Sequence, residues 1–345
     1  MRRAGALIAA ALAATLAVPM LLGGRDALWQ TLHLPARDYL AIFGVIAVSW
    51  IARPLKIMLL LRQLGVHVGF MRMFLISLAT DFGFISTPGG LGGYAASVFY
   101  LRRAGASVSG AATITAVDQV LDLGFFTLVL PIAGLTLIAS DLPRALAALA
   151  FGTSALVIAL ALIAVLARKR VGAWLFGSNW VSRRWPGLKR RQQALREFAA
   201  SLKANTRVLV AGGPGFMLAA AALTTAQWLG RYGVLWAALA VVGYDVSFAL
   251  TLLLQSLVLH AAMWTGMPSG GGGAEIGLGA ALAHWVPATD LATALLLWRM
   301  ATLYVCLAAG AVAVALLAHR RAESTHVHIA HESSAAQDGA EEGAH

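Results

Sequence analysis

Long apolar runs, separated by short polar stretches, recur along the whole chain. Each run is close to the roughly 20 apolar residues that a helix needs to cross a bilayer. The runs do not alternate apolar and polar positions, which favours helices over strands. We therefore predict an all-α polytopic membrane protein with about eight membrane helices. The runs cover residues 4–23, 39–61, 68–85, 108–139, 145–167, 214–241, 245–264 and 288–318.

Two glycine-rich stretches, 86–93 and 267–275, interrupt this pattern. Proline lacks a backbone donor and consecutive glycines are poor helix formers, so neither stretch can be continuous helix. Because both lie among apolar residues, we expect broken or re-entrant segments at membrane depth and not surface loops.

Three landmarks repeat in the same order in the two halves of the chain. They are Arg53, Pro88 and Gln119 in the first half and Arg231, Pro268 and Arg299 in the second. The first two landmarks are 35 residues apart in one half and 37 in the other, and the last two are 31 apart in both. The spacing predicts two related repeats, at about 39–139 and about 214–318.

The composition fits a membrane protein. Hydrophobic residues make up 59% of the chain, charged residues 12%, and the mean hydropathy is +0.77. A soluble domain carries about twice that charge. The net charge is +11, and most of the basic residues lie between the apolar runs. This distribution favours anionic lipid headgroups over nucleic acid as partners. A single cysteine, Cys306, excludes an intramolecular disulfide framework, and we expect no metal and no cofactor.

The segment 168–207 is strongly basic, with eleven Lys and Arg residues against one acid, Glu197. Apolar residues recur at helical spacing within 188–204, which predicts a basic amphipathic helix on the membrane surface, in contact with anionic headgroups. An ordinary positively charged loop is the simpler interpretation. Both place the segment in the cytoplasm.

The other basic clusters should lie on the same side as this segment. They are Arg2-Arg3, Arg102-Arg103 and Arg320-Arg321. Eight full spans with two re-entrant loops cannot satisfy all of them, whereas a broken crossing at each glycine-rich segment can. The two repeats are then inverted relative to each other. We predict a single transmembrane domain, residues 1–318, in a bacterial inner membrane. The polar tail, 319–345, is expected to be disordered and cytoplasmic.

Nine charged residues lie within or at the edge of the apolar runs. A charge at the bilayer centre costs at least about 2.5–3.5 kcal/mol, so such residues usually face a partner or a wet cavity. The alternative to a binding role is an internal salt bridge, for example between Glu275 and Arg299. Lys56 could reach the interface by snorkelling, and Asp81 and Asp245 could be helix caps or edge residues. The others are Arg53, Asp118, Asp122 and Arg231.

Helices that begin just after a glycine run present free N–H groups and a positive dipole end. Together with arginines, such ends suit a phosphate or another anion, including that of a lipid headgroup. The predicted substrate-binding residues are Arg53, Pro88, Gly89, Gly90, Gly92, Asp118, Gln119, Asp122, Arg231, Pro268, Gly270, Gly271, Glu275 and Arg299. We expect Arg299 to bind the anion and Glu275 to orient it.

These motifs resemble the flippase-like lysylphosphatidylglycerol synthase transmembrane domain family. The resemblance rests on the Pro-Gly-Gly-x-Gly stretch at 88–92, the segments 102–105 and 115–122, and Pro268, Glu275 and Trp298-Arg299 in the second half. It implies the handling of amphipathic lipids, such as aminoacylated phosphatidylglycerol, polyprenyl-linked intermediates or hopanoid-type lipids. Where the family often has an acid and an arginine, this chain has Tyr94-Ala95 and Gln119, and no aminoacyltransferase domain is expected after the helices.

The leading hypothesis is a lipid flippase or transporter that moves an amphipathic lipid, phosphate-bearing or hopanoid-type, across or out of the inner membrane without covalent chemistry. One alternative is a membrane enzyme acting on polyprenyl pyrophosphate, in which Ser269 is the one serine near the second glycine run. Another is an accessory subunit of a lipid-modifying system, with lipid-biosynthesis proteins as partners. The sequence does not specify the oligomeric state.

Overall fold

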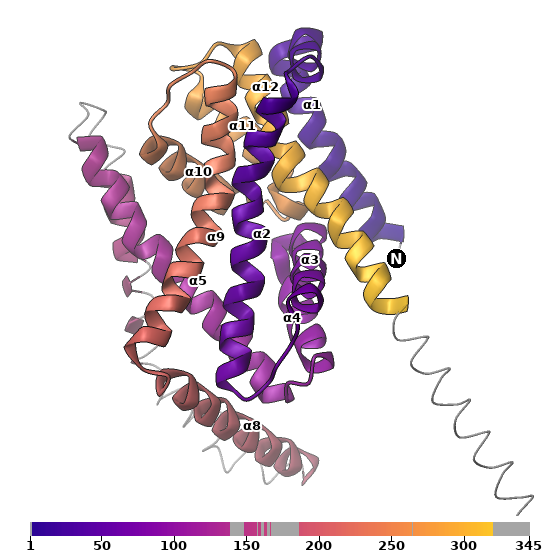
Figure 1. Ribbon diagram of the computed structural model, residues 1–345, viewed down its shortest axis with the longest axis vertical. Coiled ribbons are helices and arrows are strands. Elements are labelled where there is room, and N and C mark those ends of the chain that lie inside the picture. The colour runs from indigo at the N-terminus through magenta and orange to yellow at the C-terminus, as the bar shows by residue number, and fades with distance from the viewer. Residues whose placement is uncertain are drawn as a thin grey trace, which may run out of the picture.

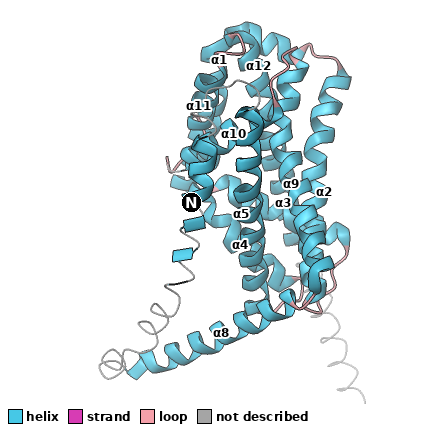
Figure 2. Cartoon of the chain, turned by 90° about the vertical axis from the view of Figure 1, so that its left-hand side faces the viewer, coloured by secondary structure: helices cyan, strands magenta, loops and turns pink. Residues whose placement is uncertain are grey.

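The computed structural model describes residues 2–138, 148–156, 158–159, 162–163, 166, 186–263 and 265–319. Every regular element in these ranges is a helix (Figure 2). The first half contains α1 (Arg2–Leu32), α2 (Ala36–Gln63), α3 (Phe70–Ser86), η1 (Pro88–Gly90), α4 (Leu91–Arg103) and α5 (Val108–Ile138). The second half contains α8 (Pro186–Val210), α9 (Gly213–Val241), α10 (Phe248–Met263), η2 (Pro268–Gly270), α11 (Gly273–Leu282), α12 (Ala288–Arg299) and η3 (Met300–Tyr304).

The all-α polytopic prediction is confirmed, and the longest apolar runs form the longest helices. Four of these are long and apolar enough to cross a membrane: Ala9–Leu32, Ala36–Gln63, Val108–Ile138 and Ala288–His319. A fifth is formed by Gln193–Val210 and Gly213–Val241 if this bent pair counts as one span. Of the predicted run 145–167, residues 148–156, 158–159, 162–163 and 166 are described and helical, whereas 168–185 and the tail after 319 lie outside the described residues.

The predicted runs 68–85 and 245–264 are not full spans but arms of hairpins. Helices α3 and α4 form hairpin one (70–103), and Arg72 near its beginning donates a hydrogen bond to the carbonyl of Arg103 at its end, at 2.7 Å. Helices α10 and α11 form hairpin two (248–282), in which Gly277 lies against Val258. Each hairpin therefore returns toward the end from which it entered (Figure 1).

The turn of hairpin one depends on its glycines. Gly89 and Gly90 have φ of 61° and 72°, in the left-handed region that glycine adopts without a steric penalty. Thr87 Oγ1 donates to the carbonyl of Gly83 at 2.7 Å and accepts from the N–H of Gly92 at 2.8 Å. The chain reverses within a few residues, so of the two forms predicted for this stretch, broken or re-entrant, the structure has the re-entrant one.

The two hairpins enter from opposite ends and meet at their tips, where η1 lies against η2 (Figure 1). Helices α2 and α9 lie side by side and run in opposite directions, with Gly230 allowing close approach: a Cβ there would lie 2.8 Å from the backbone nitrogen of Ser49. The unit from α2 to α5 is thus arranged antiparallel to the unit from α9 to α12. In the sequence, the spacing of the landmarks predicts the two repeats and the positions of the basic clusters predict their inversion.

One end of the molecule, here called the basic end, carries the α4–α5 turn with Arg102 and Arg103 and, next to it, helix α8 (Figure 1). Helix α8 bends by 96° from α9, so it runs across the bundle and not along it (Figure 2). It covers the described part of the predicted amphipathic helix, and Leu195 and Phe198 leave apolar surface exposed. This geometry fits a helix that lies in the membrane interface.

Candidate functional site

Arg53 on α2 lies at the centre of a group of charged side chains beside hairpin one. Its Nη1 donates to Oδ1 of Asp81 on α3, and its Nη2 lies 4.0 Å from Oδ2 of Asp118 on α5. The Cζ atom of Arg53 also lies 5.4 Å from the centre of the Phe84 ring. Arg53 on α2 therefore contacts acids on two other helices of the first repeat, α3 and α5.

Lys56, three residues further along α2, is completely buried. Its Nζ lies 2.6 Å from Oδ1 of Asp118 and 2.9 Å from Oδ1 of Asp122. The two aspartates are four residues apart, so they lie on one face of α5 and both reach the same ammonium. The snorkelling interpretation of Lys56 is wrong, because its carboxylate partners lie inside the protein.

The second repeat contributes one residue to this group. Arg231 on α9 points Nη1 toward Oδ2 of Asp81 at 3.9 Å, and its side chain is 26% exposed. Three cations and three acids then share one region, here called the charge network: Arg53, Lys56, Arg231, Asp81, Asp118 and Asp122. The formal charges cancel, which makes burial of so many ions tolerable away from bulk water.

Hairpin one covers the network with aromatic and polar side chains. Phe84 at the end of α3 meets Tyr94 at the start of α4 edge-to-face, with ring centres 4.9 Å apart. The Tyr94 hydroxyl donates to Oε1 of Gln119 at 3.2 Å. The predicted residues Pro88, Gly89, Gly90 and Gly92 shape this hairpin turn through their backbones.

Glu275 and Arg299 form a separate ion pair under hairpin two, here called the sealed pair. Arg299 Nε donates to Glu275 Oε1, and the two side chains are 3% and 0% exposed. The guanidinium carbon also lies 4.3 Å from the centre of the Trp298 ring. Among the described residues, Arg299 Nη2 and Glu275 Oε2 have no hydrogen-bond partner. The pairing interpretation of these two residues thus has direct geometric support.

The glycines of hairpin two bring it against α1. Gly270 and Gly272 have φ of 64° and 80°, and a Cβ on Gly271 would lie 2.9 Å from the carbonyl oxygen of Ala11. Pro268, Gly270 and Gly271 are buried. Directly after Arg299, residues Met300–Tyr304 form a π-helical turn, a feature that is frequent at functional sites.

The structure therefore divides the predicted site residues into two groups. Arg53, Asp118, Asp122 and Arg231 join the charge network, with Gln119 at its side. Glu275 and Arg299 form the sealed pair, and among the described side chains no ion pair links it to the network.

Sequence reasoning underrated two members of the network, Lys56 and Asp81. Both lie inside predicted apolar runs, and a charge in such a run is the signal that could have assigned them to the charge network.

Long apolar helices, two hairpins and buried charged side chains define an all-α, multi-pass membrane protein. The sequence matches the family described as "Lysylphosphatidylglycerol synthase TM region" over residues 4–310, and the chain belongs to this family. It is also similar to a "UPF0104 membrane protein" of Archaeoglobus fulgidus. The two are 23% identical over 268 residues, covering 77% of this chain and 82% of the relative. The resemblance inferred from the motifs is confirmed at the level of the family.

Proposed function

We propose that this protein is a lipid flippase or transporter that moves a phosphate-bearing lipid across or out of a bacterial inner membrane. The observation that carries the proposal is the charge network, in which three cations and three acids meet beside the tips of two opposed hairpins. Membership of a family involved in lipid handling agrees with it.

The network offers an anion two arginines that share one acid. Arg53 and Arg231 both face Asp81, and the Arg231 side chain is the most exposed of the three. A lipid phosphate can replace Asp81 as the partner of these guanidinium groups, since arginine binds phosphate and carboxylate with the same planar, bidentate geometry. This chemistry favours a phosphate-bearing lipid over a hopanoid-type lipid, whose polar group carries no such anion.

Opposed hairpins support movement between the two sides. The hairpins enter from opposite ends of the molecule, and their tips touch at η1 and η2. A small displacement of one hairpin against the other would change which end the arginines face, as in other transporters built from inverted repeats. We further propose that no covalent step is involved, because the grouped side chains are paired ions and not a nucleophile with an adjacent base.

The orientation is part of the proposal. The basic end, with α8, should face the cytoplasm because Lys and Arg accumulate on that side of bacterial membrane proteins. Reporter fusions at residues 190 and 330 are expected to give cytoplasmic signals. A signal from outside at 330, with one from inside at 190, would mean a different number of crossings after α8.

Transport is tested with purified protein in proteoliposomes that contain phosphatidylglycerol with a fluorescent acyl chain. Dithionite bleaches only the outer leaflet, so protein-dependent bleaching of the inner-leaflet probe reports movement. We expect wild type and Arg62→Gln, an exposed control at the end of α2, to transport, and Arg231→Gln to lose most of this activity. Equal activity in Arg231→Gln and wild type would contradict the role of the network. If the purified protein instead releases phosphate from a lipid phosphate or pyrophosphate, and Ser269→Ala abolishes that release, the alternative of a membrane enzyme is favoured.

A further inference from the structure

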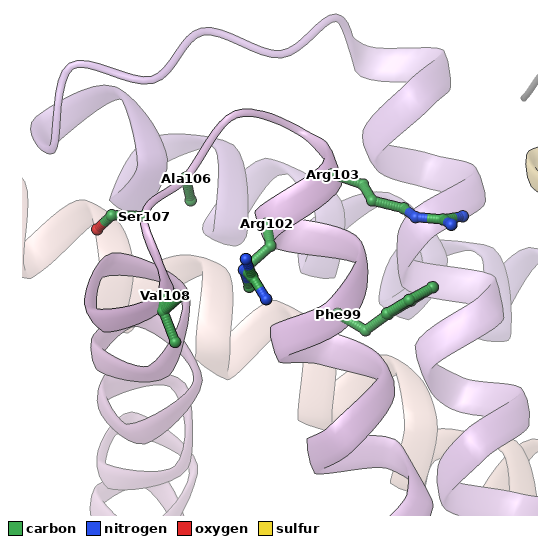
Figure 3. A pocket seen from close by; sticks show the side chains of 6 residues that line it. All are labelled: Phe99, Arg102, Arg103, Ala106, Ser107 and Val108. Carbon is green, nitrogen blue, oxygen red and sulfur yellow. The ribbon is translucent and has the colours of Figure 1, made fainter. Parts of the chain in front are cut away.

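A cavity of about 470 Å³ lies at the basic end, in the turn that joins α4 to α5. It is distinct from the charge network: α4 comes nearest to the network at Tyr94, which donates to Gln119, and the lining of the cavity begins at Phe99, five residues and so about 7.5 Å further along the helix. Figure 3 shows its lining, which consists of Phe99, Arg102, Arg103, Ala106, Ser107 and Val108.

Two arginines dominate the chemistry of this cavity. Arg102 and Arg103 are exposed, and neither forms an ion pair with an acid among the described residues. In Figure 3 the Arg102 guanidinium points into the space between the end of α4 and Val108 at the start of α5, whereas Arg103 points to the other side of α4, together with Phe99. The Arg103 guanidinium carbon lies 4.3 Å from the centre of the Phe99 ring, which holds that side chain beside the cavity and leaves N–H donors available.

The frame around the cavity is fixed before any ligand arrives. Arg72 on α3 donates to the backbone carbonyl of Arg103 at 2.7 Å, which ties the end of hairpin one to its beginning. Ser107 Oγ accepts from the N–H of Gly110 at 2.9 Å and so caps the first turn of α5. A preformed turn with two unpaired guanidinium groups loses little conformational entropy when it binds an anion.

Apolar side chains beside the arginines indicate what kind of anion fits. Phe99 is 48% exposed and Val108 is 46% exposed, so the same cavity offers both guanidinium donors and apolar surface. A free phosphate would leave this apolar surface in water, whereas acyl chains would cover it. Helix α8 packs against α5 nearby, with Asn205 Nδ2 donating to Ser109 Oγ at 3.3 Å, so its interfacial face lies at the same end.

We propose that this cavity is a second lipid site, one that binds the phosphate of an anionic membrane lipid at the basic end. Arg102 contacts the phosphate oxygens and Val108 the beginning of an acyl chain, while Arg103, beside Phe99 on the other side of the end of α4, adds positive charge at the rim. The site does not depend on whether the charge network transports lipid, because no residue is shared between them.

Native mass spectrometry of the full-length protein in a nonionic detergent tests this site. The protein is titrated with dioleoyl phosphatidylglycerol, with dioleoyl phosphatidylcholine, and with phosphatidylglycerol in the presence of excess inorganic phosphate. The test variant is Arg102→Gln/Arg103→Gln, and the matched control is Arg62→Gln, which removes an exposed arginine from the same end but outside the cavity.

We expect wild type and the control to retain one more phosphatidylglycerol than the test variant, whose affinity for that lipid should fall at least about tenfold. Phosphatidylcholine should bind the site weakly, since its own cation neutralises the phosphate, and inorganic phosphate should not displace the bound lipid. Unchanged retention in the test variant would overturn the proposal, and displacement by inorganic phosphate would reassign the site to a soluble anion. If the double variant does not fold, Arg102→Gln alone gives the same readout, because its guanidinium pairs with no described acid.

Discussion

The two hairpins share one architecture but carry different chemistry. Hairpin one lies beside six charged side chains, of which Arg231 is 26% exposed and Arg53 and Asp122 are each 13% exposed. Hairpin two covers a single ion pair that is 3% and 0% exposed and presses its glycines against α1. Related backbone arrangements thus hold one group of charges that solvent or a ligand can reach and one that is closed off.

This difference separates two uses of buried charge. A network that is partly exposed and shares its partners offers a ligand anion cations to bind. A closed pair has no replacement partner, so it holds α11 and α12 together and any change to one member is costly. The pairing therefore supports a structural role for Arg299, where the sequence suggested an anion-binding role.

The largest effect is expected at the sealed pair. Either Glu275→Gln or Arg299→Gln leaves a buried charge without its partner and should lower the free energy of unfolding by about 3–5 kcal/mol. The double substitution removes both charges and should recover much of that loss. Thermal unfolding in detergent, with and without phosphatidylglycerol, measures the loss in each single variant and the recovery in the double variant. A stable Arg299→Gln variant that no longer responds to the lipid would instead assign Arg299 to lipid binding.

The second-largest loss of stability is expected on replacing Lys56, because its ammonium is the only cation that contacts both Asp118 and Asp122 among the described residues. Lys56→Met leaves Asp118 and Asp122 facing each other, and we expect a loss of about 3 kcal/mol in unfolding free energy. Adding Asp118→Asn should restore part of it. Lys203→Met, on the exposed face of α8, is the control and should unfold like wild type. A Lys56→Met variant as stable as wild type would show that water replaces the ammonium.

Close helix approach within each hairpin should give an intermediate effect. A Cβ on Gly93 would lie 2.1 Å from Cγ of Phe84, and one on Gly277 would lie 2.6 Å from Cγ1 of Val258. Alanine at either position should cost about 1–3 kcal/mol through overpacking. Gly44→Ala, where nothing lies within 4 Å, should be neutral or stabilising in the same unfolding measurement. Equal stability of all three variants would mean that the hairpin arms separate readily.

Arg231 should matter least for stability and most for transport. Its contact with Asp81 is long and partly exposed, so Arg231→Gln should change the unfolding free energy by less than about 1 kcal/mol. In the proteoliposome assay the same variant should be strongly impaired, and Arg231→Lys should recover part of the activity because lysine keeps the charge but not the planar fork. A loss of stability and activity in parallel would make Arg231 a structural residue like Arg299.

Much of this organisation was predictable because charges are so unfavourable in apolar runs. Arg53, Asp118, Asp122 and Arg231 stood out for that reason, and they do meet in one network. The same reasoning could not choose partners: Lys56 lies near the end of a predicted span, where snorkelling and burial are equally compatible with the sequence. Only the packing of α5 against α2 decides that two carboxylates reach its ammonium.

The class of protein and the long helices are predictable from the sequence alone, because hydropathy over a window of residues is a local property. The tertiary structure decided that residues 68–85 and 245–264 are arms of hairpins, since a span and a hairpin arm have the same apolar composition. It also decided that Glu275 and Arg299 are closed off from the charge network. Partner choice among buried charges depends on how helices distant in sequence approach one another, and no local pattern specifies that.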